Sequence, residues 1–473
     1  MAYDNNKKAT SARDHSMPPL PTKCAALAGA AALALSIATA PLAARAQSQD
    51  EGELDNTALS ARPPAQQPQS FQPLADQGIT LTLNYTGEAA ANVSGGLRKD
   101  AAYAGQVYAG VDFDMDRIAG IDGGTLHVAV TNRHGKSLSA LAIGNNTSVQ
   151  EIWGTQNTHL AILTWEQHLF GDRLVVEAGR SQANIHFLNS PLYCQFQGNS
   201  GCGNPTFVFK NSNFTYFPAS SWMFHAKAQL TDHVYAHIGT YEVNPDRKQA
   251  SDHGTDFGIG NATGVIVPWE LSYESGEAAR LPFRYILGGW VDKADYDDPL
   301  RDDTGGIAIL SGRPAQVHNG RSGLYFRFEQ KLTRPDPASK RGLSIYGVAM
   351  TNLSGRVEES RFFDLGLVQT GTFPGRDEDS VGFMISDQRF SNLAMQRMRA
   401  ADRAGDGSGN VSRHQVMMEL SYSAQIGPAI RLSPNIQYIH NPDRTGDPFR
   451  GSSTKDALIF GAKFTIDAFK LGQ

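Results

Sequence analysis

Apolar and polar residues alternate along most of the chain from Gly78 onward. In the stretch GITLTLNYTGEA, Ile79, Leu81, Leu83 and Tyr85 share one face of an extended strand, and threonine and asparagine occupy the other. The same period of two recurs in later segments, whose apolar positions run through Val107 to Phe113, Leu126 to Val130, Phe224 to Leu230, Phe283 to Leu287, Leu324 to Phe328 and Val416 to Tyr422. Alternation of this kind predicts β-strands with one apolar and one polar face.

The connections between these strands are short and long in turn. Short ones include 171–173, 231–233 and 427–429, and long ones include 184–221, 296–322 and 392–410. The pattern gives about sixteen strands, with every long connection after an odd-numbered strand, which is the layout of an outer-membrane barrel. The predicted fold is therefore an all-β, antiparallel, up-and-down transmembrane β-barrel with short periplasmic turns and long external loops.

Soluble β-proteins also alternate, so they are the alternative. A β-propeller would show a repeat of roughly 40 to 50 residues, and the chain shows no such repeat. A β-sandwich architecture of this length would need two or three domains joined by linkers, and we find no linker after Gln77. Both observations favour the barrel.

The N-terminal residues have the pattern of an export signal. Basic residues precede an apolar, alanine-rich run from Ala25 to about Ala40, and an Ala-x-Ala motif ends at Ala46. This order predicts a secretory signal peptide over residues 1–46, cut after Ala46. The apolar run is too short for a good membrane helix, which needs about 20 residues, although an uncleaved anchor is the alternative. The true start is Met1 or Met17.

Composition divides the rest of the chain into two parts. Residues 47–77 are rich in Gln, Pro, Ser, Asp and Glu and predict a flexible periplasmic spacer, which leaves 78–473 for the barrel. The full chain has a net charge of −5, and removal of a leader with more basic than acidic residues makes it more negative. An acidic exported chain offers no basic surface for nucleic acid.

Three ordered stretches resemble one known family. They are ANVSGGLRKDAAYAGQVYAGVDFDMDRIAGIDGGTLHVAV from Ala91, WEQHLFGDRLVVEAGRSQANIHF from Trp165 and NFTYFPASSW from Asn213. In their order and spacing they resemble the OprB-type carbohydrate-selective porins of Gram-negative outer membranes. The chain departs from that pattern in its cysteine-containing loop and in Phe469, which falls out of phase with the last strand.

The resemblance implies a function and a set of partners. It implies a sixteen-stranded barrel that passes monosaccharides or small oligosaccharides through a narrowed, polar and aromatic eyelet. Such a barrel would contact outer-membrane lipid and lipopolysaccharide and would be inserted by the barrel-assembly machinery. Its oligomeric state is left open. The alternatives are a general or anion-preferring porin, a barrel enzyme, and a secreted carbohydrate-binding protein.

By analogy with porins, the third long loop should fold into the lumen and narrow it. A sugar pore needs aromatic faces for sugar C–H surfaces and polar groups that replace hydration. The candidate contacts are Arg180, Asn184 and His186, followed by Arg98 in the first loop and Trp222 at the end of the third. For each, the alternative is a side chain that only braces the loop.

Other motifs are weaker. Arg284, Trp290, Arg327 and Glu329 face the lumen, where an ion ladder on the inner wall is the favoured interpretation. The run DRAGDGSGN lacks a full calcium ligand set and is better read as an external loop. We expect no cofactor, no metal site and no catalytic residues, since no nucleophile and histidine can be paired from the sequence.

Cys194 and Cys202 are the two cysteines of the exported chain, because Cys24 lies in the leader. A zinc site would want about four ligands, and a redox motif would need two intervening residues where seven are present. An exported protein is oxidised in the periplasm, so the prediction is a structural disulfide within the longest loop.

The disulfide should fix the eyelet and contribute little to the barrel. Cys194→Ser combined with Cys202→Ser should change sugar flux or selectivity, measured in liposomes, and leave the heat resistance of the barrel nearly unchanged. Loss of folding in the double variant would contradict this expectation.

Overall fold

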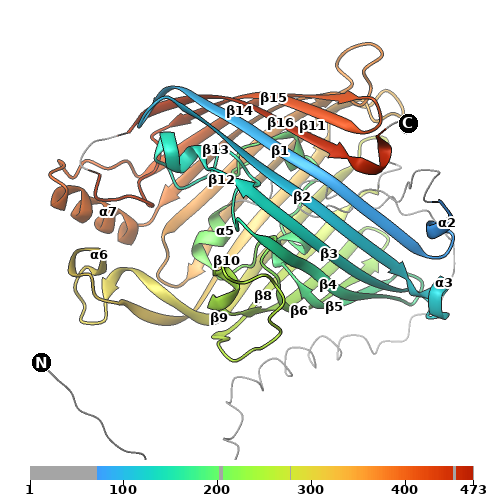
Figure 1. Ribbon diagram of the computed structural model, residues 1–473, viewed down its shortest axis with the longest axis horizontal. Coiled ribbons are helices and arrows are strands. Elements are labelled where there is room, and N and C mark those ends of the chain that lie inside the picture. Colours follow the sequence, from blue (N-terminus) through green and yellow to red (C-terminus); the bar gives the residue numbers. More distant parts are fainter. Residues whose placement is uncertain (1–71, 202–205, 277–278, 451–453, 472–473) are drawn as a thin grey trace, which may run out of the picture. The chain divides into compact units, whose positions relative to one another are not determined.

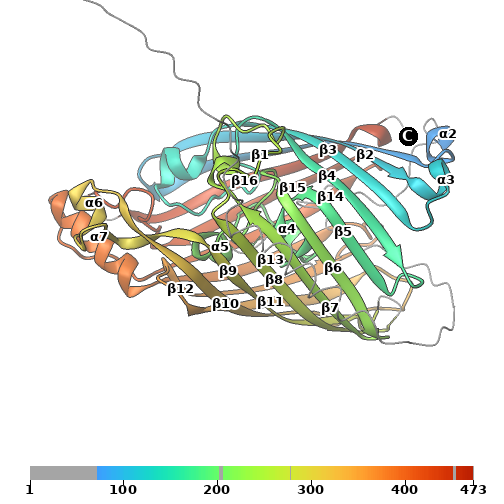
Figure 2. The ribbon, with the colours of Figure 1, turned by 90° about the horizontal axis from the view of Figure 1, so that it is seen from below.

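The computed structural model describes residues 72–201, 206–276, 279–450 and 454–471. Within them the chain forms a closed barrel in which each strand pairs antiparallel with its sequence neighbours and the last strand pairs with the first (Figures 1 and 2). The barrel has sixteen strands, so the predicted fold is confirmed. The predicted signal peptide and most of the predicted spacer lie outside the described residues.

The strands are β1 (Ile79–Gly96), β2 (Asp100–Asp114), β3 (Gly124–Gly135), β4 (Thr158–Leu169), β5 (Leu174–Ser181), β6 (Ser221–Thr231), β7 (Val234–Val243), β8 (Gly264–Glu274), β9 (Phe283–Asp302), β10 (Ala315–Lys331), β11 (Gly342–Ser354), β12 (Glu359–Thr370), β13 (Ser380–Phe390), β14 (His414–Ile426), β15 (Ile430–His440) and β16 (Lys455–Asp467). The helices are α2 (Gln72–Ala75), α3 (Met115–Ala119), α4 (Ala183–His186), α5 (Thr206–Asn211), α6 (Ala308–Ser311) and α7 (Asn392–Ala404), with a π-turn at Ser139–Ile143 and 3-10 turns at Tyr193–Gln195, Pro245–Lys248 and Ala468–Lys470. No helix in the described ranges has the length and apolarity needed to cross a membrane.

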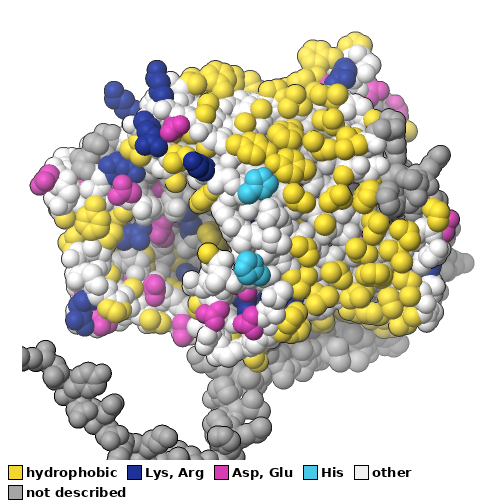
Figure 3. Space-filling view, in the orientation of Figure 1, with side chains coloured by type: hydrophobic (Ala, Val, Ile, Leu, Met, Phe, Trp, Pro, Cys, Tyr) yellow, Lys and Arg dark blue, Asp and Glu magenta, His cyan; other side chains and the backbone are white. Residues whose placement is uncertain are grey.

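The two faces of the wall follow the predicted alternation. Leu420 on β14 and its cross-strand partners Phe383 and Ile436 are exposed on the outer surface. The next residue, Glu419, is 2% exposed and points inward. Hydrophobic side chains cover the outer surface over the strands, whereas charged side chains gather near the end that carries α6 and α7, where the surface is hollowed (Figure 3).

The connections agree with the predicted order in most places. The long segments 136–157, 182–220, 244–263, 391–413 and 441–454 all follow odd-numbered strands. The prediction that long connections follow odd-numbered strands is confirmed for these segments, but strict alternation of short and long is wrong, because β1 and β11 are followed by the short turns 97–99 and 355–358. The predicted loop 296–322 is also shorter, since β9 and β10 continue as a paired ribbon into it.

The end of the chain explains the residue that falls out of phase. β16 ends at Asp467, whose side chain accepts a hydrogen bond from the backbone N–H of Phe469 at 3.1 Å. The chain then makes the 3-10 turn Ala468–Lys470. Phe469 therefore lies beyond the strand and follows a different period.

A charged side chain on the outward face should destabilise the barrel most near the middle of a strand. Leu420→Arg, at a position 49% exposed near the middle of β14, should destabilise the barrel by about 2–4 kcal/mol in lipid vesicles. Leu353→Arg, at a position 62% exposed near the loop end of β11, should cost about 0–1 kcal/mol. Urea unfolding of both variants measures this, and equal losses would contradict the placement of the membrane.

Candidate functional site

The third loop (182–220) lies inside the barrel and packs against its inner wall. Phe187, Phe207 and Phe214 of the loop are fully or almost fully buried in one apolar cluster with inward-facing side chains of the wall, including Trp290 and Phe362. Both ribbon views place α5 within the ring of strands (Figures 1 and 2). The predicted inward fold of this loop is thus seen in its packing, and the loop narrows the lumen.

Carboxylates on the wall hold the backbone of the third loop. The two oxygens of Glu419 on β14 accept hydrogen bonds from the N–H groups of Gln197 and Gly198, at 2.7 and 2.8 Å. Oε1 of Glu270 on β8 accepts the N–H of Leu188 at 3.0 Å. A carboxyl group offers two acceptor oxygens, so these two wall side chains fix separate parts of the loop.

Two further acidic side chains hold the second half of the loop. Asp292 on β9 accepts the N–H of Asn213 at 2.9 Å. Glu359, the first residue of β12, pairs with Nζ of Lys210 at 3.3 Å. Burial acts to lower the pKa of Lys210, but the Glu359 carboxylate outweighs it and raises the pKa above its ordinary value. Lys210 therefore stays charged at neutral pH.

The segment beside the cysteines reaches the opposite wall. The carbonyl of Gln195 accepts a hydrogen bond from Ser421 Oγ at 2.8 Å, and Nε2 of Gln197 contacts the carbonyl of Ala89 at 3.2 Å. The third loop thus spans from β8 and β9 to β14 and β1. Cys202 lies outside the described residues, and the disulfide stays a prediction.

The second loop (136–157) also folds inward, which the alternation of the strands does not predict. The N–H of Glu151 donates to the carbonyl of Gln197 at 2.9 Å and so joins the second loop to the third. The N–H of Ile152 donates to Oε2 of Glu88 on β1 at 3.2 Å. Burial raises the pKa of Glu151 against the opposing effect of nearby Lys463 and Arg133.

Two of the predicted pore residues point away from the lumen. Arg180 and Trp222 are cross-strand partners on β5 and β6, three positions from the inward pair Glu177 and His225, and therefore share the outer face. The Arg180 guanidinium lies 5.3 Å from the ring of Phe257 in the fourth loop (244–263), and the Trp222 indole donates to the Phe257 carbonyl at 3.0 Å. Their placement at the eyelet is wrong, because strand alternation sends them to the opposite face.

The other three predicted residues have different surroundings. Asn184 is fully buried, and its Oδ1 accepts the N–H of Phe217 at 2.9 Å, so it braces the third loop. His186 lies beside Glu177 and the inward face of β5. Arg98 is exposed in the short β1–β2 turn, 3.1 Å from Asp100. The structure does not bring these residues together.

The structure gives separate roles to the four residues that were predicted to form an ion ladder. Arg284 pairs with Glu274 at 2.9 Å and Arg327 lies 3.9 Å from Glu329, both along the inner wall. Trp290 is 1% exposed and packs beneath Phe207 of the third loop, with ring centroids 6.2 Å apart.

One aromatic side chain of the third loop remains exposed to solvent. Phe209 is 47% exposed although its neighbours Phe207 and Val208 are buried. Its ring meets Tyr216 edge-on at 4.9 Å, and Nζ of Lys248 lies 6.0 Å from its centroid. The sequence held no signal for this exposure, since every phenylalanine of the loop looks alike before the wall is placed.

Comparison with known proteins agrees with this geometry. The model of the carbohydrate-selective porin, OprB family, matches residues 98–467. The chain belongs to the OprB family of carbohydrate-selective porins. It is a porin for the passive diffusion of carbohydrates, and both the family and the fold point to the Gram-negative outer membrane.

Individual relatives of this porin are moderately similar. It is 28% identical to Porin B of Pseudomonas aeruginosa over 406 residues, which cover 82% of this chain and 87% of that one. It is 29% identical to the putative porin QuiX of Acinetobacter baylyi over 394 residues, 78% of this chain and 86% of the other. The high pH structure of Pseudomonas putida OprB aligns with a TM-score of 0.76 and 26% identity, covering 84% of this chain and 96% of that one.

The carboxylate anchors of the porin should set the shape of its constriction. Glu419→Gln leaves one acceptor oxygen where two now accept N–H groups of the third loop, so single-channel current should become noisier and sugar discrimination should fall, while heat resistance of the barrel persists. Glu378→Gln at the β12–β13 turn, where Glu378 is exposed and 3.4 Å from Lys340, is the matched control. Unchanged conductance in the Glu419 variant would contradict the anchoring role.

Proposed function

We propose that this porin discriminates uncharged saccharides at a constriction whose shape is held by the second and third loops. The observation that carries the proposal is the anchoring of the third loop by buried carboxylates from β8, β9, β12 and β14. A loop fixed at both sides of the lumen presents the same wall to every solute. Selectivity between similar sugars requires such a wall, because small changes in width would blur it.

The chemistry of the inner surface suits a sugar. Saccharides offer C–H faces that stack on aromatic rings and hydroxyl groups that exchange hydrogen bonds with polar side chains. Exposed Phe209 beside Tyr216 supplies a ring face, and Nζ of Lys248 lies 6.0 Å from the centre of that ring. Weak contacts of this kind slow a sugar without trapping it.

The predicted pore residues have distinct parts in this proposal. His186 is retained as a contact on the lumen side of β5, and Asn184 acts by holding the third loop. Arg98, exposed in the β1–β2 turn, meets solutes at the entrance. Arg180 and Trp222 have no part in the eyelet, since they face outward.

The proposal includes the route by which the chain reaches the membrane. Export by a signal peptide cleaved after Ala46 would leave the spacer 47–77 in the periplasm, ahead of a barrel in contact with lipid and lipopolysaccharide. Insertion would depend on the barrel-assembly machinery. N-terminal sequencing of the mature protein tests the cleavage site.

Phe209 tests the aromatic part of the proposal. Phe209→Ala should weaken sugar block of ion current by roughly two- to tenfold, as expected for an aromatic contact worth about 0.5–1.5 kcal/mol. The measurement is titration of single-channel current with a panel of neutral monosaccharides and disaccharides.

The control and the rival are tested in the same assay. Phe373→Ala, at a position 51% exposed in the β12–β13 turn, should leave the titration unchanged. A general or anion-preferring porin would show the same current with every sugar and would pass charged solutes equally well, which would overturn the selective constriction.

A further inference from the structure

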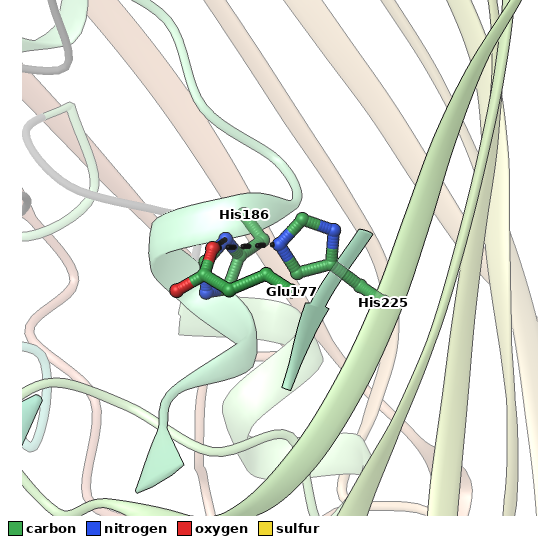
Figure 4. A group of neighbouring side chains, drawn as sticks. All are labelled: Glu177, His186 and His225. Atoms are coloured by element: carbon green, nitrogen blue, oxygen red, sulfur yellow. Dashed lines mark hydrogen bonds and ion pairs between the residues drawn. The ribbon is translucent and has the colours of Figure 1, made fainter. Parts of the chain in front are cut away.

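Three side chains that offer metal-ligand atoms converge at the foot of the third loop. Glu177 comes from β5, His225 from β6 and His186 from the end of α4 (Figure 4). Oε2 of Glu177 lies 3.0 Å from Nε2 of His225 and 3.8 Å from Nδ1 of His186. All three ligand atoms lie within 4.8 Å of one another. They come from two neighbouring strands and the long loop that joins them.

These separations fit one transition-metal ion. Zinc binds imidazole nitrogen at about 2.0–2.1 Å and carboxylate oxygen at about 2.0–2.2 Å in tetrahedral sites, so neighbouring ligand atoms lie roughly 3.4 Å apart. The separations of 3.0 and 3.8 Å lie on either side of that value. Small side-chain rotations would bring Glu177, His186 and His225 into the coordination distance.

The far ring nitrogens of both histidines already have partners. Nδ1 of His225 lies 3.1 Å from Nε2 of His237, and Nε2 of His186 lies 3.3 Å from Oγ of Ser181. A metal-ligating histidine commonly donates its other N–H to such a partner, which sets the tautomer and aims the ligand nitrogen. Without metal, Nε2–H of His225 donates to Glu177; with metal bound, donation by the far nitrogen to its partner would leave the nitrogen nearer Glu177 free to coordinate.

The outer partner is itself held in place. The ring of His237 stacks on Phe187 of the third loop, with centroids 4.0 Å apart and an angle of 17°. Phe187 is fully buried in the apolar cluster under the loop. The site is thus supported by packing behind it, as engineered and natural metal sites require.

Burial favours coordination over a solvated ion pair. The side chains of Glu177, His186 and His225 are 5%, 12% and 7% exposed. A charge so enclosed needs a partner; the two histidines supply one to Glu177 in this structure, and a divalent ion held by all three side chains would supply a stronger one. Three protein ligands leave a fourth position for water, the arrangement of exchangeable zinc sites.

We propose that Glu177, His186 and His225 bind one divalent transition-metal ion of the zinc class and that this ion ties the foot of the third loop to the barrel wall. The site shares His186 with the pore contacts proposed above, but metal binding is measured directly and stands whether or not the constriction discriminates sugars. Bound metal would reduce motion of α4, so pore current would change when the ion binds.

The test uses the full mature porin in detergent, purified without a polyhistidine tag. Zn²⁺ is titrated against a chelating dye to give stoichiometry and affinity, and Co²⁺ is titrated with visible absorption as a probe of coordination geometry. Single-channel current is then recorded with Zn²⁺ and after addition of a chelator. We expect one equivalent of either ion, a Co²⁺ spectrum typical of low coordination number, and a reversible change in current.

Variants assign the ligands. His186→Asn with His225→Asn should abolish the stoichiometric site and the Co²⁺ spectrum. His237→Phe, which removes only the outer partner, should weaken metal affinity about 10- to 100-fold. The control His233→Asn with His253→Asn removes two exposed histidines and should bind metal like the parent protein.

Folding of each variant is checked by heat modifiability on electrophoresis, so that loss of binding is scored only in closed barrels. The proposal is overturned if the parent protein shows no saturable binding, or if the folded double variant at positions 186 and 225 binds as the parent does. In either case the three side chains would form only a hydrogen-bonded network that holds the loop.

Discussion

Hydrocarbon offers no hydrogen-bond partner, so the wall of this protein must satisfy its own backbone. Pairing of β16 with β1 does this by removing both sheet edges. Closure also gives every strand a lipid side and a lumen side, and the buried acidic side chains Glu270 and Glu419 lie on the second. The acidic residues that hold the loops are therefore all inward-facing by necessity. The architecture of the pore follows from that single constraint.

The same constraint explains why the loops are anchored by charges. A carboxylate on the inner wall is stable only if it is hydrated or hydrogen-bonded. Glu419 and Glu270 are satisfied by N–H groups of the third loop, and the loop gains fixed acceptors for its irregular backbone. Wall and loop thus complete each other, while the apolar cluster around Phe187 and Phe207 supplies the packing energy. Hydrogen bonds to the wall carboxylates fix the position of the third loop, and apolar contacts hold it against the wall.

The fold could be predicted from local pattern, because the alternation within each strand shows which of its faces is apolar and which is polar. The outward placement of Leu420 and the inward placement of Glu419 follow directly from alternation. The same rule, applied to β6, places Trp222 with Phe224 on the outer face. The sequence pattern therefore already argued against Trp222 as a pore residue. Candidate-site geometry was less accessible. The exposure of Phe209 depends on contacts between residues far apart in sequence, which periodicity does not contain.

Convergence of side chains shows this limit most clearly. Glu177, His186 and His225 come from three elements, and no spacing rule links them. The inward turn of the second loop is similar, since Glu151 meets Gln197 only after both loops have folded. Sequence patterns predict which side of a strand a residue takes. They do not predict which loop will cover it.

The fourth loop covers part of the outer rim of the barrel. Its residues His253 and Phe257 bond to Leu160 and Trp222, and its backbone accepts the guanidinium of Arg180. These contacts lie on the outer face at the loop ends of the strands, where β4 begins at Thr158, β5 ends at Ser181 and β6 begins at Ser221. The rim on that side therefore presents loop backbone in place of strand side chains.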